Sequence, residues 1–354
     1  MEENTQKNIR NYWRINKIMK KKIILVGGDT MGSVSPLLAI AEKYNAEYLF
    51  IGTKNGVERK VVESIGIDYK SINNGKLRRY FDLNNFIDIF KIIIGFFQSF
   101  KIIYKYKPDL VLTSGSFVAV PVVIAGFILR IPSFVHQQDI VVGLANKIMS
   151  FFAKKITITF PGQINNFNYK KTVLTGNPVR SLKNLVETKP LVVITGGGLG
   201  ARDFNNFLKE FILIITKKYE VHHILGKNNF DQKLNIKNYF PYEFINEEMR
   251  ELLYNSEFII SRAGMSLISE AANFKKTLFL IPIPGSHQEK NAEFFSKNNS
   301  VLFVNQGSRQ IMKRYLEKVM SNKELRYALG KNLNNLFPRN AVDNYIKLIE
   351  NTLK

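Results

Sequence analysis

The chain has 354 residues, 45% of them hydrophobic, which corresponds to about two domains with ample core and excludes a disordered chain. It contains no cysteine, which excludes a disulfide scaffold, cysteine–zinc and iron–sulfur sites and cysteine nucleophiles, and its four histidines show no metal-ligand spacing. The 51 Lys and Arg against 29 Asp and Glu give a net charge of +22, which attracts polyanions: nucleic acid, anionic lipid or phosphorylated substrates. Biased coding toward Lys, Asn, Ile and Phe explains many of these lysines equally well.

Residues 1–18 are polar and contain neither a signal peptide nor a membrane span. Met19 and three lysines then lead directly into the apolar run 23–26. We therefore expect residues 1–20 to be a disordered basic arm or a mis-called start, and a chain that begins at Met19 to be as stable as the full chain.

Short β-branched runs alternate with helical periods, which predicts βαβ units and parallel sheets. In the first half we expect strands at 23–26, 48–52, 109–113, 133–136 and 155–159, with a helix over 37–44. In the second half we expect strands at 191–194, 221–225, 258–261 and 277–281. Each half opens with a strand, a glycine-rich turn and a helix, so the sequence predicts two doubly wound α/β domains whose ligands bind in the cleft between them.

The domain boundary is expected near Gly176–Arg180. The expected units are residues 21–178, residues 179–337, and a last helix over residues 338–354.

Residues 83–107 are rich in Phe and Ile, with polar residues at 88, 91, 98 and 101 near a helical period. The internal charges argue against a bilayer span. The basic stretch 76–80 precedes this segment, and a basic loop beside an apolar helix is typical of interfacial membrane contact, for which residues 76–103 are the expected route. The alternative is a helix that simply packs on the sheet.

Two glycine-rich turns, at 27–33 and 196–200, each join a strand to a helix. Such turns offer free N–H groups to an anion, but neither has the P-loop sequence. A dinucleotide site is disfavoured at the second turn because Glu220 precedes its strand.

Arg262–Glu270 is a third strand-to-helix turn. Its Glu270 suits either a ribose diol or a helix-cap role.

These motifs in this order resemble the peptidoglycan N-acetylglucosamine (GlcNAc) transferase family known as MurG, which has the GT-B fold. The resemblance runs from about residue 21 to the C-terminus. It rests on 27–36, 115–118, 136–139, 176–180, 196–202, 262–270 and 287–292.

The resemblance implies an acceptor and membrane-contact site in the N-terminal domain, a UDP-GlcNAc site in the C-terminal domain, and a last helix over 338–354 that returns to the N-terminal domain. Acceptor diphosphate contacts would come from Gly27, Gly28, Thr30, Gly32, Gly115 and Ser116. Donor contacts would come from Arg180, Gly196, Gly197, Gly198, Gly200, Ile245, Met265, Ser266, Glu270, His287 and Gln288. Within this set Arg180 and the glycines would hold the diphosphate, and Glu270 the ribose.

Several positions depart from the family pattern. Ser33 stands where the family usually has a histidine, and a serine hydroxyl cannot accept a proton unaided at pH 7. Asp29 and Met31 replace loop glycines, Gln137 and Asp139 change a His-Glu-Gln-Asn segment, and Leu267 replaces a usual threonine. In the second turn, Gly198-Leu199 replaces a usual Ser-Gln pair. The catalytic candidates are therefore Asp29, Ser33 and Asp139, with a carboxylate expected as the base and Asp29 favoured over Asp139; helix capping is the alternative for Asp29.

The resemblance implies an inverting transferase that moves GlcNAc from UDP-GlcNAc to a polyprenyl-diphosphate-linked muramyl pentapeptide, at the cytoplasmic face of the cell membrane. The alternatives are a GT-B transferase with another lipid-linked acceptor and a catalytically degraded UDP-sugar-binding membrane protein. No cofactor is expected, although Mg²⁺ could assist. Nucleic acid is not an expected partner because no DNA- or RNA-binding motif is present.

Overall fold

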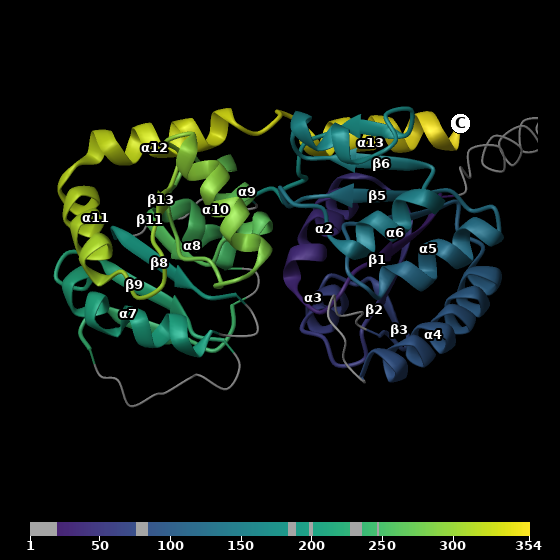
Figure 1. Ribbon diagram of the computed structural model, residues 1–354, viewed down its shortest axis with the longest axis horizontal. Helices are drawn as coiled ribbons and strands as arrows, with labels where there is room; N and C mark the ends of the chain where they lie inside the picture. The colour runs from purple at the N-terminus through teal and green to yellow at the C-terminus, as the bar shows by residue number, and fades with distance from the viewer. Residues whose placement is uncertain (1–19, 76–83, 183–188, 198–200, 227–235, 246–247) are drawn as a thin grey trace, which may run out of the picture.

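The computed structural model describes residues 20–75, 84–182, 189–197, 201–226, 236–245 and 248–354, and shows two parallel sheets, each covered by helices (Figure 1). Residues 1–18 and the basic stretch 76–80 lie outside the described residues. Each strand that the sequence predicts is present, so the expectation of two doubly wound α/β domains is confirmed.

The first sheet has the strand order β3-β2-β1-β4-β5-β6-β7. Its strands are β1 (Lys22–Val26), β2 (Glu47–Gly52), β3 (Asp68–Ser71), β4 (Leu110–Thr113), β5 (Ser133–Gln137), β6 (Lys155–Ile158) and β7 (Thr172–Leu174). Its helices are η1 (Met31–Ser33), α2 (Ser35–Lys43), α3 (Glu58–Ser64), α4 (Asn84–Tyr106), α5 (Ala119–Ile128), α6 (Leu144–Phe152) and η2 (Pro161–Asn166). Strand order reverses between β1 and β4, where sheets of this type bind ligands at the carboxyl ends of their strands.

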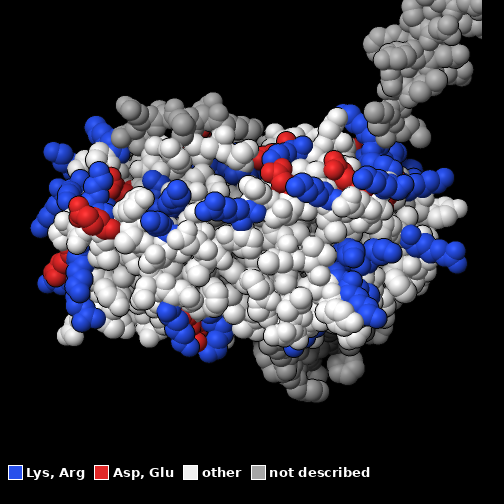
Figure 2. Space-filling model, turned by 90° about the horizontal axis from the view of Figure 1, so that it is seen from above, with Lys and Arg blue, Asp and Glu red and all other residues white. Residues whose placement is uncertain are grey.

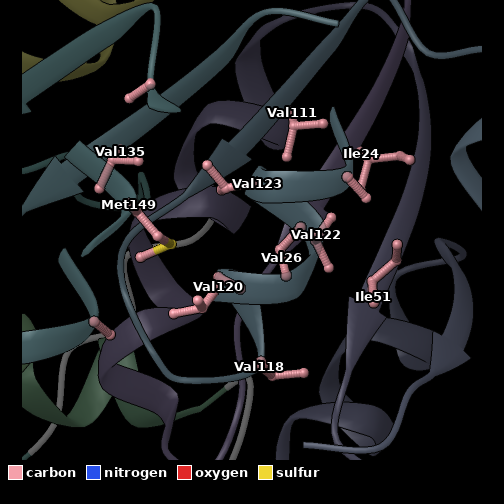
Figure 3. Packing of buried hydrophobic residues seen from close by; sticks show 14 of the residues in the cluster. Ile24, Val26, Ile51, Val111, Val118, Val120, Val122, Val123, Val135 and Met149 are labelled. Carbon is pink, nitrogen blue, oxygen red and sulfur yellow. The ribbon is translucent and has the colours of Figure 1, made fainter. Parts of the chain in front are cut away.

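One face of this sheet packs against the valine-rich helix α5. Val120, Val122 and Val123 lie close to Ile24 and Val111 of the central strands (Figure 3). All five side chains are at most 5% exposed, so this layer holds β1 and β4 rigidly beneath the loops that follow them.

The second sheet has the order β10-β9-β8-β11-β12-β13. Its strands are β8 (Leu191–Thr195), β9 (Glu220–Ile224), β10 (Tyr239–Tyr242), β11 (Ser256–Ser261), β12 (Thr277–Leu280) and β13 (Leu302–Phe303). Its helices are α7 (Arg202–Ile215), α8 (Met249–Asn255), α9 (Met265–Asn273), α10 (His287–Lys297), α11 (Arg309–Ser321) and α12 (Lys323–Asn335), and the chain ends with α13 (Ala341–Leu353). Strand order reverses between β8 and β11, again at a pair of glycine-containing turns.

Helix α13 returns to the first sheet after α12 has packed on the second (Figure 1). Its Tyr345 and Ile349 are fully buried in the cluster that contains Ile23 and Leu25 of β1. The chain passes between the domains twice, near Gly176 and near Pro338. These two segments touch, because a Cβ built on Gly176 would lie 3.1 Å from the Pro338 Cβ. The domains are therefore joined at two adjacent points.

Helix α4 buries one of the polar residues that mark its helical period. Asp88 is only 5% exposed and accepts a 3.0 Å hydrogen bond from Lys91. Phe90 and Phe97 are each 66% exposed, whereas Phe96 packs against the core. The helix thus buries one apolar face and presents a second to solvent, because it carries more apolar residues than one packing face requires.

None of the helices in the described part of the chain is long and apolar enough to cross a bilayer. Lys and Arg spread over both domains on the face that carries α12 and α13, rather than gathering in one tract (Figure 2).

Candidate functional site

The loop between β1 and α2 is closed by Ser33. Its hydroxyl accepts a hydrogen bond from the Gly28 N–H and lies within donating distance of the Gly28 carbonyl, both at 3.0 Å. The residue is 9% exposed. The hydroxyl is therefore engaged in hydrogen bonds within the loop.

Gly28 in this loop lies directly on a buried carboxylate. A Cβ built on Gly28 would lie 2.8 Å from Glu58 Oε1, so no larger residue fits. Glu58 Oε1 also accepts hydrogen bonds from the Thr53 N–H at 2.9 Å and the Thr53 hydroxyl at 2.6 Å. The Glu58 carboxylate, which Thr53 holds in place, therefore supports the backbone of the loop at Gly28.

Asp29 occupies the outer turn of the same loop with φ of 67°, in the left-handed region. Asp and Asn tolerate that conformation better than other non-glycine residues. Thr30 next to it is exposed, and Met31 and Gly32 are partly buried. Asp29 therefore replaces a glycine without distorting the turn.

The turn after β4 brings a second glycine beside the first loop. Gly115 has φ of 105°, and Ser116 follows with φ of 84°. The Ser114 and Ser116 hydroxyl oxygens are buried and have no hydrogen-bond partner among the described residues. This turn therefore holds two polar groups whose hydrogen-bonding capacity is unused.

His136, at the end of β5, is a structural residue. It is fully buried, with Nδ1 3.0 Å from the Thr157 hydroxyl and Nε2 2.8 Å from Asn177 Oδ1. Burial lowers its pKa to about 4, against the weaker opposing effect of the Asn177 and Thr157 hydrogen bonds. The ring is neutral at pH 7, and both of its nitrogens are engaged.

Asp139 meets the second domain across the boundary. Its Oδ1 accepts a 2.8 Å hydrogen bond from the Asn291 amide of α10, whose Oδ1 accepts from the Ile140 N–H at 3.1 Å. Asp139 Oδ2 lies 3.9 Å from His287 Nε2. One carboxylate oxygen is thus held by Asn291, and the other faces the start of α10.

Glu270 meets the first domain in the same way. Its Oε1 accepts a 3.0 Å hydrogen bond from the Ser35 hydroxyl at the start of α2. Burial raises the pKa of Glu270, and the Ser35 hydrogen bond and the charges of Arg180 and Arg250 oppose that rise. The carboxylate is therefore placed where a hydroxyl donor already binds it.

Arg180 does not point freely toward a ligand. Its Nε donates to Glu42 Oε1 at 2.7 Å, and Arg250 Nη1 lies 3.4 Å from the same oxygen. Both arginine side chains are at most 8% exposed. Helix α2 therefore contacts two of the residues that are predicted to bind the donor: Ser35 bonds to Glu270, and Glu42 bonds to Arg180.

The remaining predicted donor residues are spread along the carboxyl edge of the second sheet. Gly197 has φ of 97°, and a Cβ on Gly196 would lie 2.6 Å from the Ala201 Cβ. Met265 is buried, Ser266, Gln288 and Ile245 are partly buried, and His287 is exposed. Gly198 and Gly200 lie outside the described residues.

Five residues that the sequence did not single out complete the site: Ser35, Glu42, Arg250 and Asn291 at the boundary, and Gln138 within the first domain. Ser35, Gln138 and Asn291 belonged to recognised motifs, whereas Glu42 and Arg250 became visible only when distant segments met. In the described part of the chain, no group of three or more His, Asp or Glu residues is arranged to hold a metal ion.

Comparison with known proteins gives the same two halves. Residues 23–158 match the glycosyltransferase family 28 N-terminal domain, and residues 191–345 match the glycosyltransferase family 28 C-terminal domain. A Clostridium tetani UDP-N-acetylglucosamine–N-acetylmuramyl-(pentapeptide) pyrophosphoryl-undecaprenol N-acetylglucosamine transferase is 37% identical, over 94% of this chain and 98% of its own. A Clostridium botulinum protein of the same name is 38% identical, over 94% and 99%.

Solved structures show the same fold. A crystal structure of MurG from Acinetobacter baumannii has a TM-score of 0.68 at 23% identity and covers 94% of this chain and 99% of that one. A UDP-GlcNAc 2-epimerase from Neisseria meningitidis, solved bound to UDP-GlcNAc, has a TM-score of 0.69 at 14% identity, covering 93% and 100%. With the two domain matches and the clostridial relatives, these findings show that the chain belongs to the MurG family of N-acetylglucosamine transferases.

Proposed function

We propose that this chain transfers GlcNAc from UDP-GlcNAc to the 4-hydroxyl of a polyprenyl-diphosphate-linked muramyl pentapeptide, with inversion at the anomeric carbon. The observation that carries the proposal is that the loops at the carboxyl ends of β1 and β5 touch α9 and α10 of the second domain. The Ser35–Glu270 and Asp139–Asn291 contacts mark this meeting. An acceptor on the first domain and a donor on the second would therefore be adjacent.

The donor is assigned to the second domain. Glu270 has the chemistry to accept hydrogen bonds from a ribose diol, and it already accepts one from the Ser35 hydroxyl. The diphosphate would approach the turn of Gly196 and Gly197, which leads to the N-terminus of α7, although the Gly197 N–H itself already donates to the Thr195 hydroxyl at 3.2 Å. Arg180 would add positive charge, which stabilises a leaving diphosphate.

The acceptor is assigned to the first domain. Gly27, Gly28 and Gly32 precede α2, and Gly115 precedes α5, so both loops lead to helix N-termini that favour an anion. In the transfer, the acceptor oxygen bonds to the GlcNAc anomeric carbon as the bond to the UDP oxygen breaks. A base removes the hydroxyl proton, and the carboxylates of Asp29 and Asp139 are the candidates, Asp29 being favoured.

We infer that the reaction requires no resident cofactor, with charge at the diphosphates balanced by arginine and backbone N–H groups. Mg²⁺ would be an accessory ion that accompanies the donor diphosphate.

Membrane contact is assigned to α4 and its neighbours. Phe90, Ile93, Ile94 and Phe97 form an exposed apolar face, and Phe127 of α5 and Phe151 of α6 are also more than half exposed. Helices α4, α5 and α6 lie side by side on one flank of the first domain (Figure 1). Exposed Lys101 would add attraction to anionic headgroups of about 1 kcal/mol, and Lys91 less, because it is paired with Asp88. We infer that the enzyme binds peripherally at the cytoplasmic face of the membrane.

Vesicle flotation tests this surface. We expect the Phe90→Asp/Phe97→Asp variant to lose binding to anionic vesicles, whereas Tyr327→Asp, an equally exposed aromatic on α12, should keep it. Undiminished binding of the α4 variant would refute this route.

A panel of acceptors tests the proposed reaction. Purified protein and labelled UDP-GlcNAc should transfer label to the polyprenyl-diphosphate-linked muramyl pentapeptide. Transfer only to a different polyprenyl-linked sugar would establish another acceptor, and donor binding without transfer to any acceptor would indicate a non-catalytic UDP-sugar-binding protein.

A further inference from the structure

Gln138 joins the two loops that we assign to the acceptor diphosphate, and the inference below rests on that assignment. Its side-chain amide donates to the Gly32 carbonyl at 2.9 Å and to the Ser114 carbonyl at 3.2 Å. Gly32 lies in the loop after β1, and Ser114 begins the turn after β4. One side chain from the end of β5 therefore ties together the ends of three neighbouring strands.

The position of Gln138 is itself fixed. The residue is 7% exposed, and its own carbonyl lies 3.3 Å from the Gln163 amide nitrogen, which also donates to the Asp139 carbonyl at 2.8 Å. An amide nitrogen carries two hydrogens, and both are directed at loop carbonyls here. The bonds also fix the orientation of the amide, since a flipped side chain would place an oxygen against two carbonyls.

The direction of the Gly32 and Ser114 carbonyls affects how well the loops can bind an anion. Carbonyl oxygens repel phosphate oxygens, whereas backbone N–H groups attract them. By holding the Gly32 and Ser114 carbonyls beneath the loops, Gln138 keeps them out of the site. The Ser114 and Ser116 hydroxyl oxygens on the same turn are buried and have no hydrogen-bond partner among the described residues.

We propose that Gln138 is a positioning residue for the acceptor: it sets the spacing of the two glycine loops and keeps their carbonyls turned away from the bound diphosphate. It acts through the loops and does not touch the reacting atoms. The side chain required at this position is an uncharged amide of glutamine length, because it must donate twice and must bring no negative charge beneath an anion.

Two substitutions of nearly equal volume test these requirements. Gln138→Met removes both donors, and Gln138→Glu replaces the donors with a negative charge. Gln137→Met is the matched control, since Gln137 is equally buried but donates to the Asp139 and Val141 carbonyls and not to either loop. If Gln138→Met is insoluble, Gln138→Asn serves, because it is one methylene too short to reach both carbonyls.

Calorimetry with farnesyl diphosphate as the acceptor probe and UDP as the donor probe gives the decisive comparison, together with the acceptor KM. Gln138→Met should weaken farnesyl diphosphate about tenfold or more and Gln138→Glu more strongly still, with UDP affinity unchanged. The acceptor KM should rise more than kcat falls, and Gln137→Met should leave diphosphate affinity within about twofold.

Unchanged farnesyl diphosphate affinity in both Gln138 variants would overturn the proposal, and so would an equal loss of UDP affinity, which indicates general damage. The binding readout separates this proposal from the reaction. A wild-type protein that binds farnesyl diphosphate but transfers no sugar would contradict the proposed function while leaving the Gln138 test intact.

Discussion

Glu270 is the residue whose role the structure constrains most clearly. Its carboxylate accepts the Ser35 hydrogen bond and is influenced by the charges of the buried Arg180 and Arg250, and it does not lie in the first turn of its helix. Glu270→Ala should therefore reduce the free energy of UDP-GlcNAc binding by about 1.5–3 kcal/mol, the usual contribution of charge-assisted hydrogen bonds. Calorimetry should show no change for Glu317→Ala, an exposed acid on α11. Unchanged donor affinity in the Glu270 variant would mean that Glu270 does not bind the donor; helix capping is not the alternative, because the first turn of α9 contains no acidic residue.

Asp29 is tested by a substitution that preserves its backbone. Its φ of 67° is one that asparagine also adopts, so Asp29→Asn removes basicity with little strain. If Asp29 is the base, kcat should fall about 10²-fold or more while donor affinity is unchanged. Near-full turnover of Asp29→Asn together with a loss in Asp139→Asn would make Asp139 the base. If neither variant loses turnover, the carboxylate assignment is wrong.

His136 makes the first domain sensitive to acid. Because burial lowers its folded-state pKa to about 4, below the value near 6.5 of an exposed histidine, the unfolded chain binds the proton first as pH falls. The stability contributed by the neutral ring is complete above about pH 6.5 and declines toward pH 4, by on the order of 3 kcal/mol. Urea unfolding at pH 7.5 and 4.5 should show a smaller decline for His136→Gln. Equal declines would mean that His136 is not the group responsible.

At the level of elements, helix α2 has two functions. It supports the acceptor loop, and it contacts two predicted donor ligands through Ser35 and Glu42. Ser35 donates to Glu270 Oε1 as a ribose hydroxyl would, so a ribose hydroxyl that takes the same lone pair would displace it. Ser35→Ala should then tighten UDP-GlcNAc binding by up to about tenfold, the equivalent of one hydrogen bond to a charged group. Ser150→Ala is the control, because the Ser150 hydroxyl donates to the Lys147 carbonyl within α6. Weaker binding in Ser35→Ala would show that Ser35 orients Glu270 instead.

The sequence predicted the central strands of both sheets correctly and missed the short strands at the sheet edges. Strands such as β1 and β8 are continuous buried apolar runs, a pattern that follows from burial on both faces of a parallel sheet. The four strands that were missed, β3, β7, β10 and β13, are short, and each lies at or beside a sheet edge, where polar residues are tolerated. For α4 the period was right, but one buried charge, Asp88, showed that polarity alone does not identify the solvent side.

At the level of the whole molecule, the site is a product of two domains meeting. Glycines in strand-to-helix turns could be found from sequence because their role is local. Asn291 and Ser35 could not, because their partners Asp139 and Glu270 are 152 and 235 positions away in the chain. The order of the motifs along the chain indicated the family, whereas the contacts across the domain boundary are visible only in the structure.

The central claim is that these two domains bring donor and acceptor together for sugar transfer. Its most direct test is a transfer assay with the full chain, labelled UDP-GlcNAc and polyprenyl-diphosphate-linked muramyl pentapeptide in anionic vesicles, with UDP release measured in parallel. We expect one UDP released for each GlcNAc transferred, with the new glycosidic bond inverted relative to the donor. Donor binding without any transfer, or UDP release without a disaccharide product, would contradict the account.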